Sequence, residues 1–170
     1  KGLERLAEHM DICFESDDMG ELRALLEGED VTLEMRTENT GELASKIAGH
    51  SEVRAALLKR QRLFAKGDGL VADGRDMGTV IFPNANLKIY MTASIEERAS
   101  RRYKELLAKG EDVSLRALAE QVRARDERDM SRDVSPLVPA EDAIELDTSS
   151  LSIKEVLETI LDTLDAKGFR

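Results

Sequence analysis

The run GLVADGRDMGT, residues 69–79, constrains the fold of this chain more than any other stretch. Three small apolar residues, Leu70 to Ala72, lead directly into charged side chains, as at the end of a buried strand. A strand that is apolar on both faces predicts a parallel sheet covered by helices, and such sheets bind ligands at the carboxyl ends of their strands. We therefore expect Asp73, Arg75 and Asp76 to lie at an anion site. The alternative is a surface turn whose adjacent charges pair with one another.

A second cluster of charge lies in residues 114–133, which are predicted to form one amphipathic helix capped by Ser114. Arg125, Arg128 and Arg132 fall at i, i+3 and i+7, a spacing that would place three guanidinium groups on one face. Because the arginine fork suits phosphate oxygens, a phosphorylated ligand would relieve their mutual repulsion. A solvated helix whose arginines pair with neighbouring aspartates explains the same spacing, and the pattern alone leaves both interpretations open.

Composition limits the class of protein. The chain has 170 residues, of which 41% are hydrophobic and 35% charged, and its net charge is −10. These values fit one globular domain, with or without a small insertion, and disfavour a general nucleic-acid binder, so any anion site must be formed locally by arginines. The single Cys13 precludes an internal disulfide, and neither a membrane span nor a signal peptide is evident. We expect a cytoplasmic monomer that binds neither nucleic acid nor membrane.

The chain divides into two regions with different patterns. In residues 1–66, period-2 alternation over residues 12–35 predicts a small antiparallel sheet of two or three strands. Residues 67–170 alternate strands and helices, which is typical of an α/β fold. Ser94 is expected to cap a helix, and Ser152 to form a capping box with Glu155. Parallel strands are expected at 70–73, 87–91 and 143–146, and helices at 36–49, 51–66, 95–108, 114–133 and 153–166.

Three features indicate a missing beginning. Only three strands of the expected parallel sheet are present, fewer than is usual. No Gly-x-x-x-x-Gly-Lys-Ser/Thr run, the loop that cradles phosphates in many phosphoryl-transfer enzymes, occurs in the sequence. The chain also opens inside a helical pattern without an N-cap. We therefore expect a fragment that lacks an N-terminal segment.

Four stretches carry a resemblance to a known family: LEGEDVTLEMRT, GLVADGRDMGTVIFPNANLKIYMTAS, EERASRRYKELLAKG and RARDERDMSRDVSPLVPAEDAIELDTSSLSI. In this order, and over essentially the whole chain, they resemble bacterial cytidylate kinases. The resemblance implies an α/β nucleoside monophosphate kinase fold of the P-loop NTPase type, with a three-layer parallel sheet and helices, incomplete at the N-terminus, plus a small antiparallel insert at 12–35. It also implies a monophosphate-binding region at 1–66 and a core region at 67–170, with a mobile lid at about 98–113.

The resemblance implies an activity as well. Family members transfer a phosphoryl group from ATP to CMP or dCMP, giving CDP or dCDP and ADP, with Mg²⁺ as the metal ion. Because the phosphate-binding loop and its lysine have no counterpart in these residues, the chain alone is expected to be inactive. Two alternatives remain: a kinase of another nucleoside monophosphate, such as UMP or AMP, and a nucleotide-binding module without catalysis.

Substrate-binding residues carry over by position, from the resemblance alone. Ser45, Arg54 and Arg132 would contact the cytosine ring. Arg125 and Asp129 would hold the ribose hydroxyl groups.

Catalytic and donor-binding residues follow in the same way. Arg75 would clamp the acceptor phosphate, and Asp73 and Asp76 would lie nearby, with Asp73 ordering Mg²⁺ through water. Arg101 and Arg102 would close over the donor triphosphate. The turn of Asp147, Thr148 and Ser149 would lie against adenine. Alternatively, Arg98, Arg101 and Arg102 are surface partners of Glu96 and Glu97.

Overall fold

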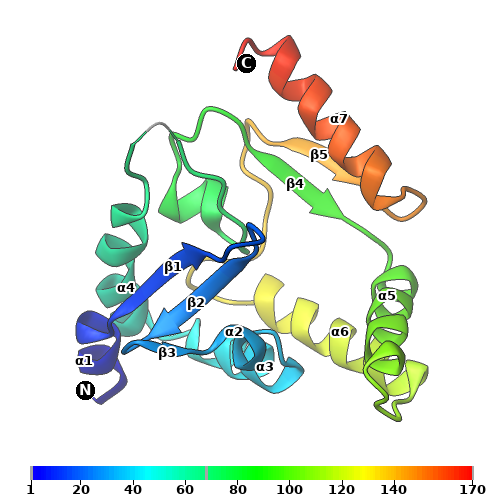
Figure 1. Cartoon of the computed structure of the whole chain (residues 1–170), viewed down its shortest axis with the longest axis horizontal. Coiled ribbons are helices and arrows are strands. Elements are labelled where there is room, and N and C mark those ends of the chain that lie inside the picture. The colour runs from blue at the N-terminus through cyan, green and yellow to red at the C-terminus, as the bar shows by residue number, and fades with distance from the viewer. Residues whose placement is uncertain (1, 68, 170) are drawn as a thin grey trace. The chain divides into compact units, whose positions relative to one another are not determined.

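The computed structural model describes residues 2–67 and 69–169 (Figure 1). The chain forms two compact units, one made of residues 1–73 with 132–136 and the other of residues 74–131 with 137–170. Each unit has its own sheet, which is antiparallel in the first and parallel in the second.

The first unit contains the small antiparallel sheet that the alternating sequence pattern predicts. β1 (Ile12–Ser16) pairs with β2 (Leu22–Leu26), and β2 pairs with β3 (Glu29–Asp30). The turn between β2 and β3 consists of Glu27 and Gly28, whose φ angles are 52° and 83°. Two positive φ angles in a two-residue turn match the right-handed twist of the flanking strands, so the turn sets the register of this hairpin.

The alternation to residue 35 predicts a strand after β3, but the structure differs from this expectation. The segment forms the short helix α2 (Thr32–Met35). The Asp30 carboxylate accepts the backbone N–H of Thr32 at 3.0 Å, and the Thr32 hydroxyl accepts the N–H of Ala24 in β2 at 2.9 Å. Because these side chains bond the backbone locally, the chain leaves the ladder at this point and the predicted alternation ends in a helix.

Three longer helices complete the first unit and confirm the predicted helical segments. They are α1 (Gly2–His9), α3 (Glu38–Ile47) and α4 (Ser51–Leu63). α1 packs against α4 (Figure 1), and each buries one apolar residue, Ala7 and Val53.

The second unit is built on two parallel strands. β4 (Ile89–Thr92) pairs with β5 (Ile144–Asp147) in register, so that Thr92 lies opposite Asp147. Both strands start within two residues of the positions that the sequence predicts. Their carboxyl ends meet at the same edge, where ligands of parallel sheets usually bind.

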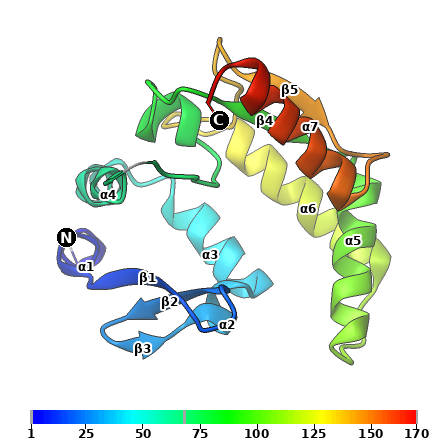
Figure 2. The ribbon, with the colours of Figure 1, turned by 45° about the horizontal axis from the view of Figure 1, so that its top comes forward.

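Helices follow each strand of the second unit. α5 (Ile95–Ala108) and α6 (Leu115–Met130) cross and pack against each other (Figures 1 and 2), and α7 (Ile153–Ala166) follows β5. The α5–α6 pair encloses an apolar core, whose members are Ala99, Leu106 and Leu118 with Tyr103, Val113 and Ala119 around them. No helix in the described ranges is long and apolar enough to cross a membrane.

The predicted strand at 70–73 is wrong. These residues are irregular and exposed, Leu70 at 45% and Val71 at 100%, and the next element is the π-helix η1 (Met77–Ile81). A strand exists only where a neighbouring strand accepts and donates its backbone hydrogen bonds. Among the described residues, parallel pairing is confined to β4 and β5, and residues 70–73 have no ladder partner.

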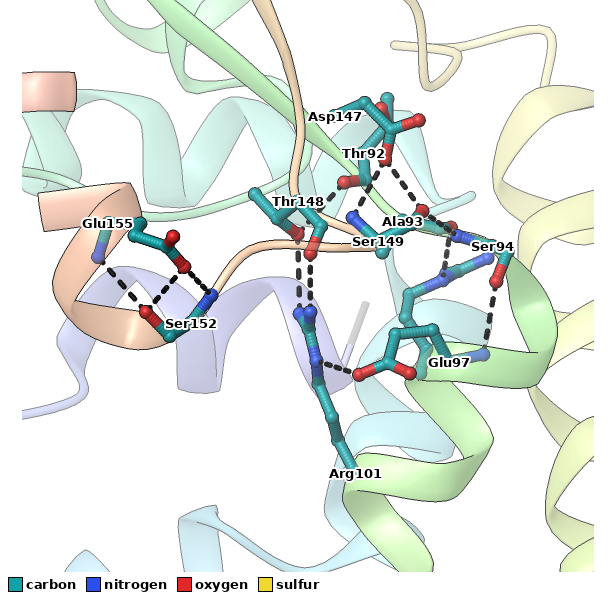
Figure 3. Close-up of polar contacts among 11 residues, drawn as sticks. Thr92, Ala93, Ser94, Glu97, Arg101, Asp147, Thr148, Ser149, Ser152 and Glu155 are labelled. Carbon is teal, nitrogen blue, oxygen red and sulfur yellow. Dashed lines mark hydrogen bonds and ion pairs between the residues drawn. The ribbon is translucent and has the colours of Figure 1, made fainter.

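The predicted helix caps are confirmed. The Ser94 hydroxyl accepts the Glu97 N–H at 3.1 Å at the start of α5, and Ser114 caps α6. At the start of α7, the Ser152 hydroxyl accepts the Glu155 N–H at 3.3 Å and the Glu155 carboxylate accepts the Ser152 N–H at 2.8 Å (Figure 3). This reciprocal pair of bonds satisfies two N–H groups of the helix terminus.

The capping box of α7 can be tested by removing one hydroxyl group. Ser152→Ala should lower the free energy of unfolding by about 1 kcal/mol, because the Glu155 N–H loses its acceptor. Urea denaturation followed by circular dichroism measures the change. Ser150→Ala is the matched control, since the exposed Ser150 side chain forms no hydrogen bond within the described residues, and its effect should stay within about 0.5 kcal/mol. Equal losses in the two variants would contradict the capping role.

Candidate functional site

The loops that follow β4 and β5 are tied together by backbone and hydroxyl groups (Figure 3). The backbone N–H and the hydroxyl of Thr148 both donate to the Thr92 carbonyl, at 2.8 Å and 3.0 Å. Ser149 joins the other loop, because its hydroxyl accepts the Ser94 N–H at 2.9 Å. The Asp147 carboxylate accepts the hydroxyl and the N–H of Ser149, and these bonds lower the pKa of Asp147 below its usual value. The turn of residues 147–149 is therefore fixed at the carboxyl edge of the sheet.

Arg101 reaches from α5 to this turn. Its two terminal nitrogens donate to the Thr148 hydroxyl at 3.2 Å and to the Thr148 carbonyl at 2.5 Å, and its Nε donates to Glu97 at 2.8 Å (Figure 3). The structure thus brings together Arg101 and Thr148, two residues that the sequence analysis assigned to one ligand. The alternative pairing of Arg101 with a nearby glutamate is also confirmed, since both contacts occur together.

Arg102 has other partners, although it is adjacent to Arg101. Its Nη1 donates to Glu105 at 2.8 Å, and Lys109 donates to the same carboxylate at 2.9 Å. Hydrogen bonds from Lys109 and Arg102 lower the pKa of Glu105. Because consecutive residues of a helix point in different directions, Arg102 does not share the Thr148 contact of its neighbour.

The second polar cluster surrounds two buried carboxylates of α6. Arg98 donates to both oxygens of Asp126, at 3.0 Å through Nη1 and by a shorter bond through Nη2. Arg75 lies 3.9 Å from Asp126 and 3.4 Å from Asp129, and Arg125 lies 3.9 Å from Asp129. Asp129 is only 1% exposed. The guanidinium groups of Arg75, Arg98 and Arg125 thus face these two carboxylates.

Arg98 was expected only as a surface partner of Glu96 and Glu97, and its bond to Asp126 was not predicted. A signal for Asp126 was present, because it follows the buried Leu118 by two helical turns and lies on the same face of α6 as the core. A carboxylate on a buried helix face needs a cation, and α5 is the helix that packs there. The spacing of the acids relative to the apolar stripe would therefore have pointed to a pairing arginine on α5.

The three charged residues that precede η1 differ in exposure and in the unit to which they belong. Asp73 is exposed and belongs to the first unit, whereas Arg75 and Asp76 belong to the second. Asp76 is buried, and its carbonyl accepts the N–H groups of Val80 and Ile81 at 2.9 Å and 3.2 Å. Arg75 contacts the buried acids of α6, Asp126 and Asp129.

The residues expected to contact cytosine lie in the first unit. Ser45 is buried on α3, and Arg54 on α4 donates to the Ala48 carbonyl at 3.5 Å. Arg132 lies beyond the end of α6, which stops at Met130. The expected helix face of three arginines is therefore wrong for Arg132. Pro136 disfavours helical backbone in the residue before it, and Ser135 has a φ angle of 50°, so the chain turns here.

A metal ion bound to this chain would need further oxygen ligands from a bound nucleotide. Among the described residues, no group of three or more His, Cys, Asp and Glu side chains could hold one. Mg²⁺ in phosphoryl-transfer sites is commonly bound by one or two carboxylates together with substrate phosphates. The exposed carboxylate of Asp73 is chemically suited to such an ion only when a nucleotide supplies further oxygens.

The Thr148 contacts can be tested through stability. Thr148→Val keeps the side-chain volume but removes a buried hydroxyl that bonds both Thr92 and Arg101, and should lower the free energy of unfolding by about 1–3 kcal/mol. Thr159→Val, at an exposed hydroxyl that bonds only the carbonyl one turn earlier in its own helix, is the control, with an expected change within about 0.5 kcal/mol. Thermal and urea unfolding measure both. A Thr148→Val protein as stable as the control would contradict these contacts.

Comparison with known proteins identifies the family of the chain that carries these two clusters. The family model for cytidylate kinases matches residues 1–166. A cytidylate kinase of Pseudomonas savastanoi pv. phaseolicola is 56% identical over 169 residues, which are 99% of this chain and 74% of the relative. Cytidylate kinases of Stutzerimonas stutzeri and Colwellia psychrerythraea are 56% and 53% identical, and the matches cover 95% and 92% of this chain and 71% and 69% of those relatives. With a family model matched over nearly its whole length, the chain belongs to the cytidylate kinase family.

Proposed function

We propose that this chain forms part of a kinase that transfers the γ-phosphoryl group of ATP to CMP or dCMP, giving ADP and CDP or dCDP. The observation that carries the proposal is the gathering of the guanidinium groups of Arg75, Arg98 and Arg125 around Asp126 and Asp129, in a chain of net charge −10 that belongs to the cytidylate kinase family. A phosphate monoester is an anion whose oxygens suit guanidinium donors, so such a cluster would attract it.

The second unit supplies the residues that would handle phosphate and ribose. Arg75 would bind the acceptor phosphate, because its guanidinium is held by ion pairs of 3.4 Å and 3.9 Å that leave donors available. Arg125 and Asp129 would hold the ribose hydroxyl groups. Asp76 would support the loop that carries Arg75, since its carbonyl accepts the N–H groups of Val80 and Ile81 in η1. Phosphoryl transfer needs positioning and positive charge more than covalent chemistry, and arginines supply both.

Donor binding would use the edge of the parallel sheet. The turn of Asp147, Thr148 and Ser149 would lie against adenine. Its hydrogen bonds hold the turn in one conformation, which suits contact with a flat ring. Arg101 would bind the donor phosphates, after exchanging its present bonds to Thr148 for phosphate oxygens. Arg102 is proposed for the same phosphates by resemblance only.

The first unit supplies the residues proposed to recognise the base. Ser45, Arg54 and Arg132 would contact the cytosine ring. A site that matches the exocyclic amine and N3 of cytosine discriminates against uracil, because the wrong base leaves buried polar groups without partners. Mg²⁺, when bound with the nucleotide and ordered by Asp73 through water, would neutralise phosphate charge.

Substrate preference tests this proposal. Calorimetric titration of the 170-residue chain with CMP, dCMP, UMP and AMP should give CMP and dCMP at least about tenfold tighter binding than the other two. A preference for UMP or AMP would replace the assignment with a kinase of that nucleotide.

Turnover tests the role of the chain on its own. The sequence contains no Gly-x-x-x-x-Gly-Lys-Ser/Thr run, so we expect these 170 residues to bind CMP without releasing ADP from ATP and Mg²⁺. Coupled detection of ADP measures this. Release at a rate of about 1–100 s⁻¹, which is ordinary for kinases, would contradict the expectation of a binding module.

The phosphate contact of Arg75 can be isolated by comparing CMP with cytidine. Arg75→Met should weaken binding of CMP by about tenfold or more and leave binding of cytidine within about threefold, because only CMP carries the phosphate. Arg116→Met is the control, since Arg116 is 90% exposed on α6 and its ion pair within the described residues is with Glu120 one turn away. An equal loss for both ligands would speak against a phosphate contact.

A further inference from the structure

Two arginines of the second unit share one carboxylate but are bonded to it in different ways. Arg98 donates to both oxygens of Asp126, whereas Arg75 lies 3.9 Å from one of them. This difference in bonding indicates that the two arginines have different roles. The roles inferred below rest on the proposed function and deepen it.

Most of the donors of Arg98 are taken by protein partners. Besides its two bonds to Asp126, its Nε donates to the Ala93 carbonyl at 3.1 Å, directly after β4. The bond from Asp126 raises the pKa of Arg98, so its charge is fixed. Three of the five N–H donors of the guanidinium are thereby directed at the end of β4 and at α6, a geometry that suits a clamp between elements and leaves little for a ligand.

Arg75 is not saturated. Within the described part of the chain its contacts are the two ion pairs, at 3.4 Å to Asp129 and 3.9 Å to Asp126, and neither has the geometry of a hydrogen bond. An N–H···O bond normally measures 2.7–3.2 Å between heavy atoms. The two carboxylates therefore orient the guanidinium of Arg75 without accepting hydrogen bonds from its donors.

We infer that Arg98 is a positioning residue for the acceptor phosphate: it occupies both oxygens of Asp126 and thereby keeps this carboxylate from closing on Arg75. Without Arg98, Asp126 would be a buried carboxylate beside a single cation. It would pair with Arg75 directly, because an uncompensated buried charge is costly. The phosphate would then have to compete with Asp126 for the same donors.

The test compares CMP with cytidine in the 170-residue chain, so that the phosphate contribution is read as a ratio of affinities. Arg98→Met should reduce the preference for CMP over cytidine by about tenfold, while cytidine binds within about threefold of its native affinity. The double variant Arg98→Met with Asp126→Asn should recover most of the preference, because the competing carboxylate charge is gone. A merely structural role of Arg98 predicts the opposite, since loosening of α5 and α6 weakens both ligands and a second core change adds to the damage.

Controls separate the possible failures. Arg116→Met removes an exposed arginine of the same type and should leave the ratio unchanged. Should Arg98→Met fail to fold, Arg98→Lys retains the charge with a single-headed donor, and its ratio should fall by about threefold. An unchanged ratio in the folded Arg98 variant, or a double variant as impaired as Arg98→Met, overturns the inference. A native chain that does not prefer CMP over cytidine removes the proposed phosphate site itself, and this outcome is visible before any variant is made.

Discussion

The buried carboxylates of α6 are the constraint on which the second unit depends. Asp126 and Asp129 continue the face of α6 that carries the apolar core, and a charge at such a position is tolerated only with close cations. The cations come from α5 and from the loop before η1 as well as from α6 itself. The same requirement therefore accounts for the packing of two helices and the place of Arg75, so the structure and the proposed anion binding share one cause.

The features that the sequence predicted well are local ones. The N-caps at Ser94, Ser114 and Ser152 depend on a side chain and a backbone N–H three residues further on, and all are present as expected. The antiparallel sheet depends on turn residues with positive φ angles and on alternation within short runs. Helices and strands specified by such short-range chemistry need little information from the rest of the chain.

The features that it missed depend on residues far apart. The apolar run at 70–73 has the composition of a buried strand, but a strand also needs a partner, and none lies beside it in the described residues. The bond between Arg98 and Asp126 joins positions 28 residues apart, whereas the spacing argument considered pairs within one helix. Arg132 was placed on α6 because charge spacing continues past the point where the helix ends.

Saturation of donors, more than the number of charges, distinguishes the arginines of the second unit. Arg98 is committed to Asp126 and the end of β4, and Arg101 is bonded to Thr148 and Glu97. Only Arg75 among these three is held by ion pairs longer than a hydrogen bond. An acidic chain attracts a phosphate only where the local positive charge exceeds the local negative charge and where guanidinium donors are not already bonded to protein groups. Counting arginines along the sequence detects local positive charge. Which donors remain available is determined only by the packing of α5 on α6.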